Sequence, residues 1–415
     1  MDVDHLKKCF QKISNEDRYY NETIETVIAQ CELYRGNLLL AKKTLRGAAT
    51  SALSSQSAFR KIRWYKSMAE VALWKGKLQL VEYTVSEAFK YLARNEIDQF
   101  PLRSFLYLPI ATVYYLRNEL KNALDYTTMC IRYAMQAKHV NEIIAANFLL
   151  AQIYLAIGEP ENVRLCLQNM RSASIGNSPG TIATMDAYLA ILSLATGDII
   201  AVSQWAEKRK IREDEDFSLR YFIENLAYAL LKFHQKKYYE ANRFLKMLHK
   251  RCMKRNILLA VLQIDILYSS SLYASGEKGE ARRVMEQSLT FAETERYMRP
   301  FVDYWQYVSP VLKDISLKPF HNKNYQFLMK ILDVCGIAAD SEIQKRLSNT
   351  YSVNITKREL EILKLMASGY GNKEIAQKAF ISLDTVKTHV RHIFQKLEVN
   401  SRIQAMTKAK ELQLF

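Results

Sequence analysis

The stretch from Leu149 to Leu167, LLAQIYLAIGEPENVRLCL, holds two amphipathic segments joined by a short turn at Gly158. Apolar residues recur at helical spacing on both sides of that glycine. They are Leu149, Ile153 and Leu155 before it, and Val163 and Leu167 after it. Glycine commonly ends a helix because it adopts a left-handed backbone at no steric cost. The stretch therefore predicts a helical hairpin.

The same pattern returns seven times, at spacings of 39 to 42 residues. The turn positions are Gly36, Gly76, Asn118, Gly158, Gly197, Lys236 and Gly276. Seven residues before each turn the residue is small: Ala29, Ala69, Ala111, Ala151, Ala190, Ala229 and Ser269. Five residues after each turn it is small or β-branched: Ala41, Val81, Ala123, Val163, Val202, Ala241 and Ala281. Such positions let two helices approach closely. A repeat of this period predicts stacked helical hairpins.

The pattern resembles the tetratricopeptide repeat, lengthened by about six residues per unit relative to the usual 34. The resemblance covers roughly residues 20–295 and implies an α-solenoid, a superhelix with a concave inner surface. Asn118 and Lys236 stand where the other units have glycine. At these two positions we expect a left-handed residue or a slightly wider turn.

Composition agrees with an all-α protein of more than one domain. The chain has 415 residues, of which 49% are hydrophobic and 25% charged, and only 12 Gly and 7 Pro serve its whole length. Neither a signal peptide nor an apolar run of about 18 residues is present in the sequence, so we expect a cytoplasmic protein without membrane contact. The six cysteines are scattered singly and suggest no metal or redox pair.

We expect three parts: a repeat domain over residues 1–308, a connector over 309–353 and a separate module over 354–415. The connector is expected because prolines interrupt residues 300–319, and a short apolar run from Tyr325 to Val334 then precedes a polar stretch. The net charge of +16 suggests an anionic partner. Only eight Lys and three Arg, against six acidic residues, lie in 355–415, so the positive charge is not confined to the last module.

The last module can be parsed as four short helices. Thr356 and Glu359 form a capping box that opens a first helix, with Leu360, Leu363 and Met366 on its apolar side and an end at Gly369. The expected caps of the next three helices are Asn372, Ser382 and Ser401. The third helix has Val386, Val390, Ile393 and Leu397 on its inner side. Two short helices joined by a tight turn, the second with a polar outer face, are typical of a helix-turn-helix.

The outer face of the third helix indicates contact with the DNA major groove. Its residues are Asp384, Thr385, Lys387, Thr388, Arg391 and His392. Lys and Arg can donate to guanine, and a Thr methyl group can contact a thymine methyl group. The free amides near Asn372 and Lys373, at the start of the second helix, suit a phosphate group. These patterns predict that the module binds double-stranded DNA.

The segment resembles the LuxR-type helix-turn-helix of bacterial regulators. The residues that carry the resemblance are Thr356, Arg358, Glu359, Glu361, Leu363, Gly369, Asn372, Lys373, Glu374, Ile375, Ala376, Ile381, Ser382, Thr385, Val386, Lys387, His389, Lys396, Leu397, Val399, Arg402 and Ala405. The resemblance implies that Lys387, Thr388 and Arg391 contact bases. It places Lys373, Thr385, Lys396 and Arg402 near the DNA backbone, and we assign Asn372 and His389 to the same set. It also implies a homodimer on DNA. Gly371, Ala379 and Phe380 depart mildly from the pattern.

The combination of repeat array and module is similar to the MalT-like branch of that family. The segment Arg299 to Leu312, RPFVDYWQYVSPVL, resembles that branch's post-repeat signature. The branch usually carries an ATPase ahead of the repeats, whereas no G-x-x-x-x-G-K-[ST] motif occurs in this sequence. The chain is either an ATPase-free regulator or a fragment of a longer one. In the branch, the superhelix binds an effector or a partner protein.

Two functions from different classes fit the sequence. The first is a transcription regulator whose superhelix binds an effector small molecule or a partner protein and controls the helix-turn-helix. The second is a tetratricopeptide scaffold or adaptor whose C-terminal module only anchors it to DNA. No set of catalytic residues is recognisable, so we expect neither an enzyme nor a cofactor. His389 and His392 have H-x-x-H spacing, but no further ligands converge on them.

Overall fold

The computed structural model describes residues 18–55, 57–97, 101–211, 217–317, 324–336, 356–379, 381–397 and 399–411, and every regular element in these ranges is helical. The predicted all-α fold is confirmed.

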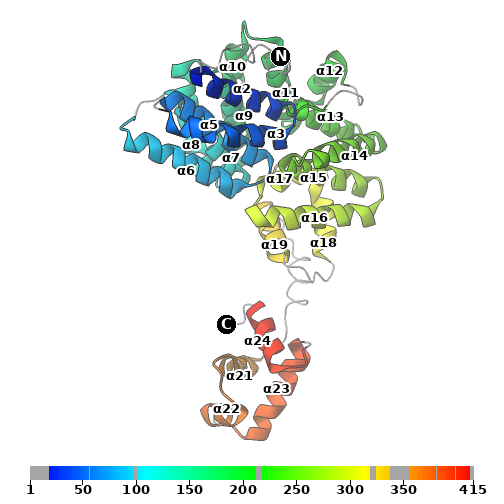
Figure 1. Ribbon diagram of the computed structural model, residues 1–415. Coiled ribbons are helices and arrows are strands. Elements are labelled where there is room, and N and C mark those ends of the chain that lie inside the picture. The colour runs from blue at the N-terminus through cyan, green and yellow to red at the C-terminus, as the bar shows by residue number, and fades with distance from the viewer. Residues whose placement is uncertain are drawn as a thin grey trace. The chain divides into compact units, whose positions relative to one another are not determined.

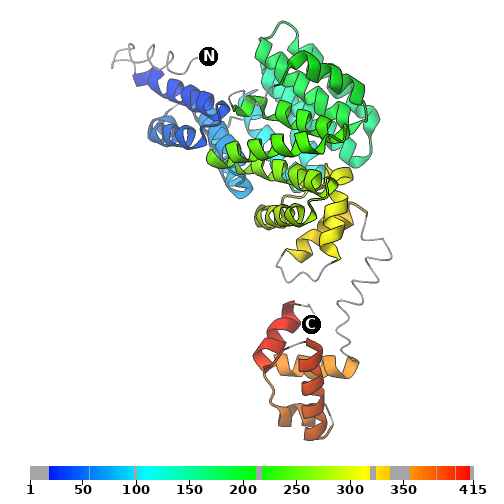
Figure 2. The same cartoon turned by 90° about the vertical axis from the view of Figure 1, so that its right-hand side faces the viewer.

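Seven hairpins follow one another, and neighbouring ones stack side by side (Figures 1 and 2). Hairpin 1 is α2 (Arg18–Tyr34) with α3 (Leu38–Gly47) and α4 (Ala49–Ser54); hairpins 2 to 7 are α5 (Ala58–Trp74) with α6 (Leu78–Arg94), α7 (Ser104–Leu116) with α8 (Leu120–Ala137), α9 (Val140–Ile157) with α10 (Val163–Ser174), α11 (Pro179–Ala195) with α12 (Ile199–Arg209), α13 (Phe222–His234) with α14 (Tyr238–Lys254), and α15 (Leu258–Ala274) with α16 (Lys278–Glu295). Short 3₁₀ turns occur at Pro101–Arg103, Pro160–Asn162 and Leu219–Tyr221.

All seven turn positions have a left-handed backbone. Positive φ angles occur at the five glycines, and Asn118 (φ 65°) and Lys236 (φ 58°) adopt the same conformation, as expected from the sequence. In every turn the amide of the next residue donates to the carbonyl five residues before it, at 2.8–3.0 Å, for example Glu159 N to Tyr154 O. This bond satisfies a carbonyl at the end of the first helix, as in a Schellman motif. The hairpin geometry is therefore the same in all seven units.

The small positions predicted from the repeat form the contact between paired helices. The seven residues that precede the turns by seven, from Ala29 to Ser269, are all buried, and so are the seven that follow the turns by five, from Ala41 to Ala281. In hairpin 7 the serine is accommodated because its hydroxyl donates to the Ala281 carbonyl at 2.6 Å. A larger side chain at these positions would push the two helices apart.

The array closes on itself, because the turns of its first three hairpins contact its last two. The Gly36 turn lies against Phe217 and Arg255, and the Ser218 hydroxyl donates to the Tyr34 carbonyl at 2.6 Å. The Gly76 turn lies so close to Phe291 of α16 that an added Cβ would be 2.6 Å from the ring. In the first turn of α6, directly after Gly76, the amide of Gln79 donates to the Glu295 carboxylate at 3.0 Å. One buried cluster accordingly spans hairpins 1, 2, 5, 6 and 7.

Three helices after hairpin 7 belong to the array, which corrects the expected connector over 309–353. They are α17 (Arg299–Val302), α18 (Trp305–Ser316) and α19 (Tyr325–Val334). The boundary was misplaced because Pro310 does not break α18, and its apolar side, with Val311 and Leu312, is fully buried. The compact unit that contains the hairpins extends to Cys335. The polar stretch from residue 341 to 354 lies outside the described residues.

A buried polar network joins α17 to hairpin 3. The Tyr115 hydroxyl donates to both carboxylate oxygens of Asp303 at 2.9 Å, and Arg299 pairs with the same carboxylate. Arg299 also donates to Asn118 Oδ1 at 3.2 Å, in the left-handed turn of hairpin 3. Burial raises the pKa of Tyr115 well above its usual range, and Asp303 adds to that rise, so Tyr115 remains a neutral donor. The network fixes the post-repeat segment to a turn about 180 residues earlier in the chain.

Helix α9 is the one described helix long and apolar enough to cross a membrane by length and composition. In the array it packs against α7, α8, α10 and α11. Its buried residues include Ile144, Ala151 and Ile153. The stacking of hairpins explains its apolar composition, because both of its flanks face other helices.

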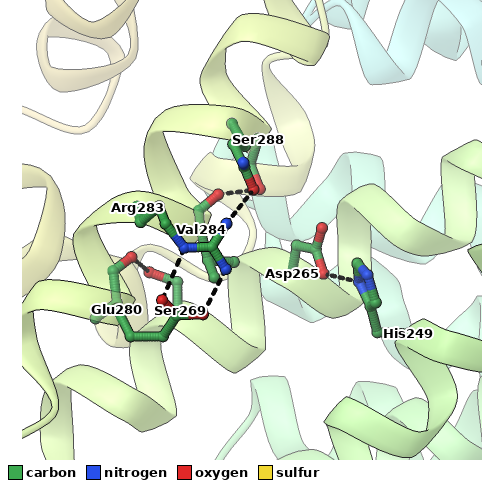
Figure 3. A network of polar contacts seen from close by, with 9 residues as sticks. His249, Asp265, Ser269, Glu280, Arg283, Val284 and Ser288 are labelled. Carbon is green, nitrogen blue, oxygen red and sulfur yellow. Dashed lines mark hydrogen bonds and ion pairs between the residues drawn. The ribbon is translucent and has the colours of Figure 1, made fainter.

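Polar contacts also hold the last hairpins together. His249 of α14 lies 2.5 Å from Asp265 of α15, and on α16 Arg283 pairs with Glu280 (Figure 3). The hydrogen bond that the His249 ring donates to the Asp265 carboxylate holds the pKa of His249 above its usual range, although partial burial opposes this. This pair joins hairpin 6 to hairpin 7.

We predict that the Gly76 and Gly158 turns respond differently to alanine. Gly158→Ala should lower the free energy of unfolding by about 1 kcal/mol, because its φ is positive but no atom lies within 4 Å of the added Cβ. Gly76→Ala should cost about 1–3 kcal/mol more, since Phe291 must also move. Urea titration followed by tryptophan fluorescence measures both, because all four Trp residues lie in the array. Equal losses would argue against the close approach at Gly76.

We predict that the His249–Asp265 pair stabilises the array at low rather than high pH. A raised pKa means that the contribution is complete below the ordinary histidine pKa near 6.5 and is lost as pH rises through the folded value. His249 is 38% exposed, so the loss should be only roughly 0.5 kcal/mol. The measurement is the difference in unfolding free energy between the natural chain and His249→Gln at pH 5.5 and 8.5. A difference that does not shrink at pH 8.5 would contradict the assignment.

Candidate nucleic-acid interface

The C-terminal module has its own apolar core. Four helices build it: α21 (Lys357–Ala367), α22 (Asn372–Lys378), α23 (Leu383–Leu397) and α24 (Arg402–Glu411). Each contributes residues that are at most 2% exposed, such as Leu363, Ile375, Ile393 and Ala405. The predicted inner side of α23 is confirmed, with Val390 partly rather than fully buried. On α21, however, Ile362 is fully buried and Leu360 only partly, so the apolar side of that helix is turned slightly from the expected one.

Three of the four predicted helix starts are confirmed. Thr356 and Glu359 form the capping box of α21, with the Thr356 amide donating to Glu359 at 2.8 Å. The Ser382 hydroxyl accepts from the Thr385 amide at 3.1 Å, and Ser401 accepts from Gln404 at 3.2 Å. These bonds satisfy amides that a helix start leaves without a partner.

The expected cap at Asn372 is wrong. Gly371 precedes α22 in extended conformation, and its amide donates to the Glu374 carboxylate at 2.7 Å, while Asn372 is the first helical residue. Because Glu374 closes the helix start from inside, the side chain of Asn372 is not used as a cap. Asn372 is half-buried and its neighbour Lys373 is exposed.

The outward side of α23 carries the three residues assigned to base contact. Lys387, Thr388 and Arg391 are all exposed, together with Asp384 and Thr385 near the start of the helix. Lys387 lies 3.1 Å from Asp384, and both side chains are well over half exposed, so this ion pair is weak. The Thr388 hydroxyl donates to the Asp384 carbonyl at 3.0 Å, which leaves its methyl group free to face outward. The helix thus presents two cations and an apolar methyl group on one side.

Gln395 extends this exposed side by one turn and was missed in the sequence analysis. It follows Arg391 by four residues and Thr388 by seven, which is the spacing of one helix face. The same counting on the sequence would have found it. His392, expected on the outer face, is only partly exposed, and so is His389, whose Nδ1 atom is buried without a hydrogen-bond partner in the described part of the chain.

Lys396 and Arg402, which are predicted to lie near the DNA backbone, also make contacts within the module. Lys396 Nζ lies 2.9 and 2.7 Å from the two carboxylate oxygens of Glu359, which is 3% exposed. Arg402 donates to the carbonyls of Met366 and Tyr370 at 3.0 and 2.6 Å. The first contact ties α23 to the start of α21, and the second ties α24 to its end.

The Glu359 carboxylate is held in its ionised form. Its burial favours the neutral acid, but the hydrogen bonds from Lys396 and Thr356 outweigh burial and lower the pKa of Glu359. A lowered pKa means that this carboxylate stabilises the fold above its ordinary value near 4.5 and stops doing so as pH falls through the folded value. The same side chain therefore caps α21 and anchors α23.

We predict that Lys396→Met loosens α21 without changing the outward side of α23. The methionine keeps the apolar stem but leaves the Glu359 carboxylate without its main partner, which should cost about 1–2 kcal/mol. Hydrogen exchange of the α21 amides in the full chain at pH 7 measures this local loss. Lys364→Met, at an exposed position on α21, is the control and should change nothing. If the α21 amides exchange at the same rate in Lys396→Met as in the natural chain, the contact between Lys396 and Glu359 does not stabilise α21.

Two family models match the chain. The model described as the MalT-like TPR region matches residues 7–316, and the one described as bacterial regulatory proteins, luxR family, matches residues 353–409. Similar proteins include the HTH-type transcriptional regulators MalT of Klebsiella pneumoniae subsp. pneumoniae, 24% identical over 430 residues, and of Serratia proteamaculans, 23% identical over 419 residues. The alignments cover 95% of this chain but 46% and 45% of those relatives. The chain thus spans about half the length of the relatives it matches.

Proposed function

This chain belongs to the MalT-like family, and on that premise we propose that it is a sequence-specific DNA-binding regulator of transcription in the cytoplasm. The observation that carries the proposal is the exposed side of α23, where Lys387, Thr388 and Arg391 stand together on the second helix of a helix-turn-helix. In such modules this helix enters the major groove.

In the proposed complex, Lys387 and Arg391 donate to guanine O6 and N7, and the Thr388 methyl group contacts a thymine methyl group. Lys387 gives up its contact with Asp384 on binding, which costs little because the pair is exposed. Asp384 is then free to accept from a cytosine amino group on the neighbouring base pair. Gln395 extends the same surface by one helical turn.

Asn372, Lys373, Thr385 and His389 contact the DNA backbone in this proposal and fix the orientation of the module. Lys396 and Arg402 contribute indirectly, by holding α23 and α24 against α21. A homodimer on DNA would pair two such modules on two half-sites, since one recognition helix contacts only a few bases.

We assign control of the module to the array. The proposed signal is an effector small molecule or a partner protein received on the concave side of the hairpins, where first helices of successive hairpins lie next to one another. The relatives are named as transcriptional regulators, which supports this assignment of the two parts.

Selection of bound sequences from a random DNA library, followed by fluorescence anisotropy with the full chain, tests the proposal. We expect a defined preferred sequence. Lys387→Ala and Arg391→Ala should each weaken binding roughly 5- to 100-fold and relax the preference at one position. Lys373→Ala should weaken binding to all sequences alike. It should also reduce the slope of the logarithm of the binding constant against the logarithm of the salt concentration by about one.

Lys364→Ala, at an exposed lysine of α21, is the matched control and should bind normally. Equal affinity for all sequences, together with unchanged binding by Lys387→Ala and Arg391→Ala, would overturn the proposal. Retention of a partner and of the cellular phenotype after removal of residues 355–415 would favour a scaffold instead.

A further inference from the structure

Two runs of the sequence contain basic residues but no acidic ones. Residues 33–69 hold eight Lys and Arg, residues 241–264 hold six, and neither run contains Asp or Glu. Together they account for +14 of the net charge of +16. The first run extends from the turn of hairpin 1 into α5, and the second covers most of α14 and the start of α15. The excess positive charge is therefore concentrated in two segments of the array.

Closure of the array brings these two segments together. An added Cβ at Gly36 would lie 3.3 Å from Cδ of Arg255, which directly follows α14, and one at Gly76 would lie 3.5 Å from Cβ of Leu258. Both views show the blue first hairpins meeting the green helices of hairpin 6 (Figures 1 and 2). The turns of hairpins 1 and 2 thus lie against the link between α14 and α15.

Five cations near this junction share one property: in the part of the chain that the structure describes, none of them forms an ion pair. They are Lys42 and Arg46 of α3, Lys75 at the end of α5, and Lys250 and Lys254 of α14. We call these five residues the basic patch. Within each of the helices α3 and α14 the two residues are four apart, so they lie on one side of the helix. Water reaches all five side chains, because none is buried.

The cations of the basic patch repel one another. Partial burial, together with the positive charges of Lys42 and Arg46, lowers the pKa of Lys75. Helix α3 contains no acidic residue that could offset these charges. Like charges held close together destabilise a folded chain unless counterions or an anionic partner neutralise them.

The acidic residues beside the two turns do not neutralise the patch. Glu32, at the end of α2, is 3% exposed and accepts from the Asn37 amide group at 2.8 Å. Glu295, at the end of α16, is 6% exposed and accepts from the Gln79 amide at 3.0 Å. Both carboxylates are buried and already have hydrogen-bond donors. The patch therefore depends on anions from outside the array.

Duplex DNA is the polyanion that the chain itself supplies. The compact unit of the array extends to Cys335 and α21 begins at Lys357. The residues between them can span at most about 70 Å, so DNA held by the module stays within reach of the array at high effective concentration. An acidic protein surface would also suit the patch, but a second chain would have to provide it.

We propose that the basic patch binds the phosphate backbone of duplex DNA beside the site that α23 reads. The lysine ammonium groups and the Arg46 guanidinium donate to phosphate oxygens, and the counterions of those phosphates are released. This contact carries no sequence information. It adds affinity and salt dependence to the recognition by the module. The inference goes beyond the proposed function but rests on it, since the module supplies the DNA.

The test is fluorescence anisotropy with the full chain and two duplexes that share the preferred site. The first duplex ends at the site, and the second continues on each side for about 30 base pairs of unrelated sequence, roughly 100 Å. At low salt the extended duplex should bind at least about tenfold more tightly, because it alone reaches the patch.

Two double variants remove two charges each from the basic patch: Lys42→Gln with Arg46→Gln, and Lys250→Gln with Lys254→Gln. On the extended duplex each should weaken binding roughly 5- to 20-fold at low salt. Each should also reduce the slope of the logarithm of the binding constant against the logarithm of the salt concentration by about two. On the short duplex neither should change the affinity.

Arg164→Gln with Arg171→Gln is the matched control. These exposed arginines of α10 lie in hairpin 4, and their removal lowers the net charge by the same amount. Lys250→Arg with Lys254→Arg keeps the charge and should bind the extended duplex like the natural chain, which separates loss of charge from damage to the fold. The variants without patch charges should unfold at no lower Tm than the control, because their repulsion is relieved.

Two results would overturn the inference. One is equal affinity of the natural chain for the two duplexes. The other is an equal loss, on the extended duplex, for the patch variants and the α10 control, which is also what a patch reserved for an acidic protein would give. The proposed function is tested separately, by replacing the preferred site within the extended duplex. If that replacement leaves binding unchanged, the proposed function fails, whereas dependence on the flanks alone decides about the basic patch.

Discussion

The left-handed residue that ends the first helix of each hairpin is the constraint on which the rest of the array depends. It reverses the chain in the same way seven times, and it lets one residue seven places earlier and one five places later meet across the hairpin. Where Asn118 and Lys236 replace glycine, the array accepts a strained backbone rather than a wider turn. Uniform hairpins are what allow regular stacking, and stacking is what produces a concave surface.

Because the array closes on itself, three of these turns also take part in packing between distant hairpins. The turns at Gly36, Gly76 and Asn118 form the surface against which hairpins 6 and 7 and helix α17 pack. Glycine is required at Gly76 twice over, by its backbone angle and by the nearness of Phe291. Arg299 and Asp303 in turn fix the segment that follows hairpin 7 against the turn of hairpin 3.

The sequence predicted the features that depend on residues close together in the chain, namely the turns and the helix caps. Repeat spacing located all seven turns, and the caps at Thr356, Ser382 and Ser401 follow from local hydrogen bonding. Prediction from the sequence failed where a contact joins residues that lie far apart in the chain. Nothing near Lys396 in the sequence indicates that Glu359 is its partner, and no periodicity indicates that Gly76 meets Phe291. The connector was misplaced for the same reason, since proline in α18 is tolerated by packing on α15 and α16. The ion pair between Lys66 and Glu142 likewise forms only because hairpins 2 and 4 come together in the stack.

A double-mutant cycle between Gly76→Ala and Phe291→Ala tests closure of the array most directly. Removing the Phe291 ring makes room for the added methyl group, so the cost of Gly76→Ala should fall to that of Gly158→Ala when Phe291 is already alanine. We expect a coupling free energy of about 1 kcal/mol or more from urea titrations of the four chains. Strictly additive losses would contradict the account, because residues 76 and 291 would then not touch.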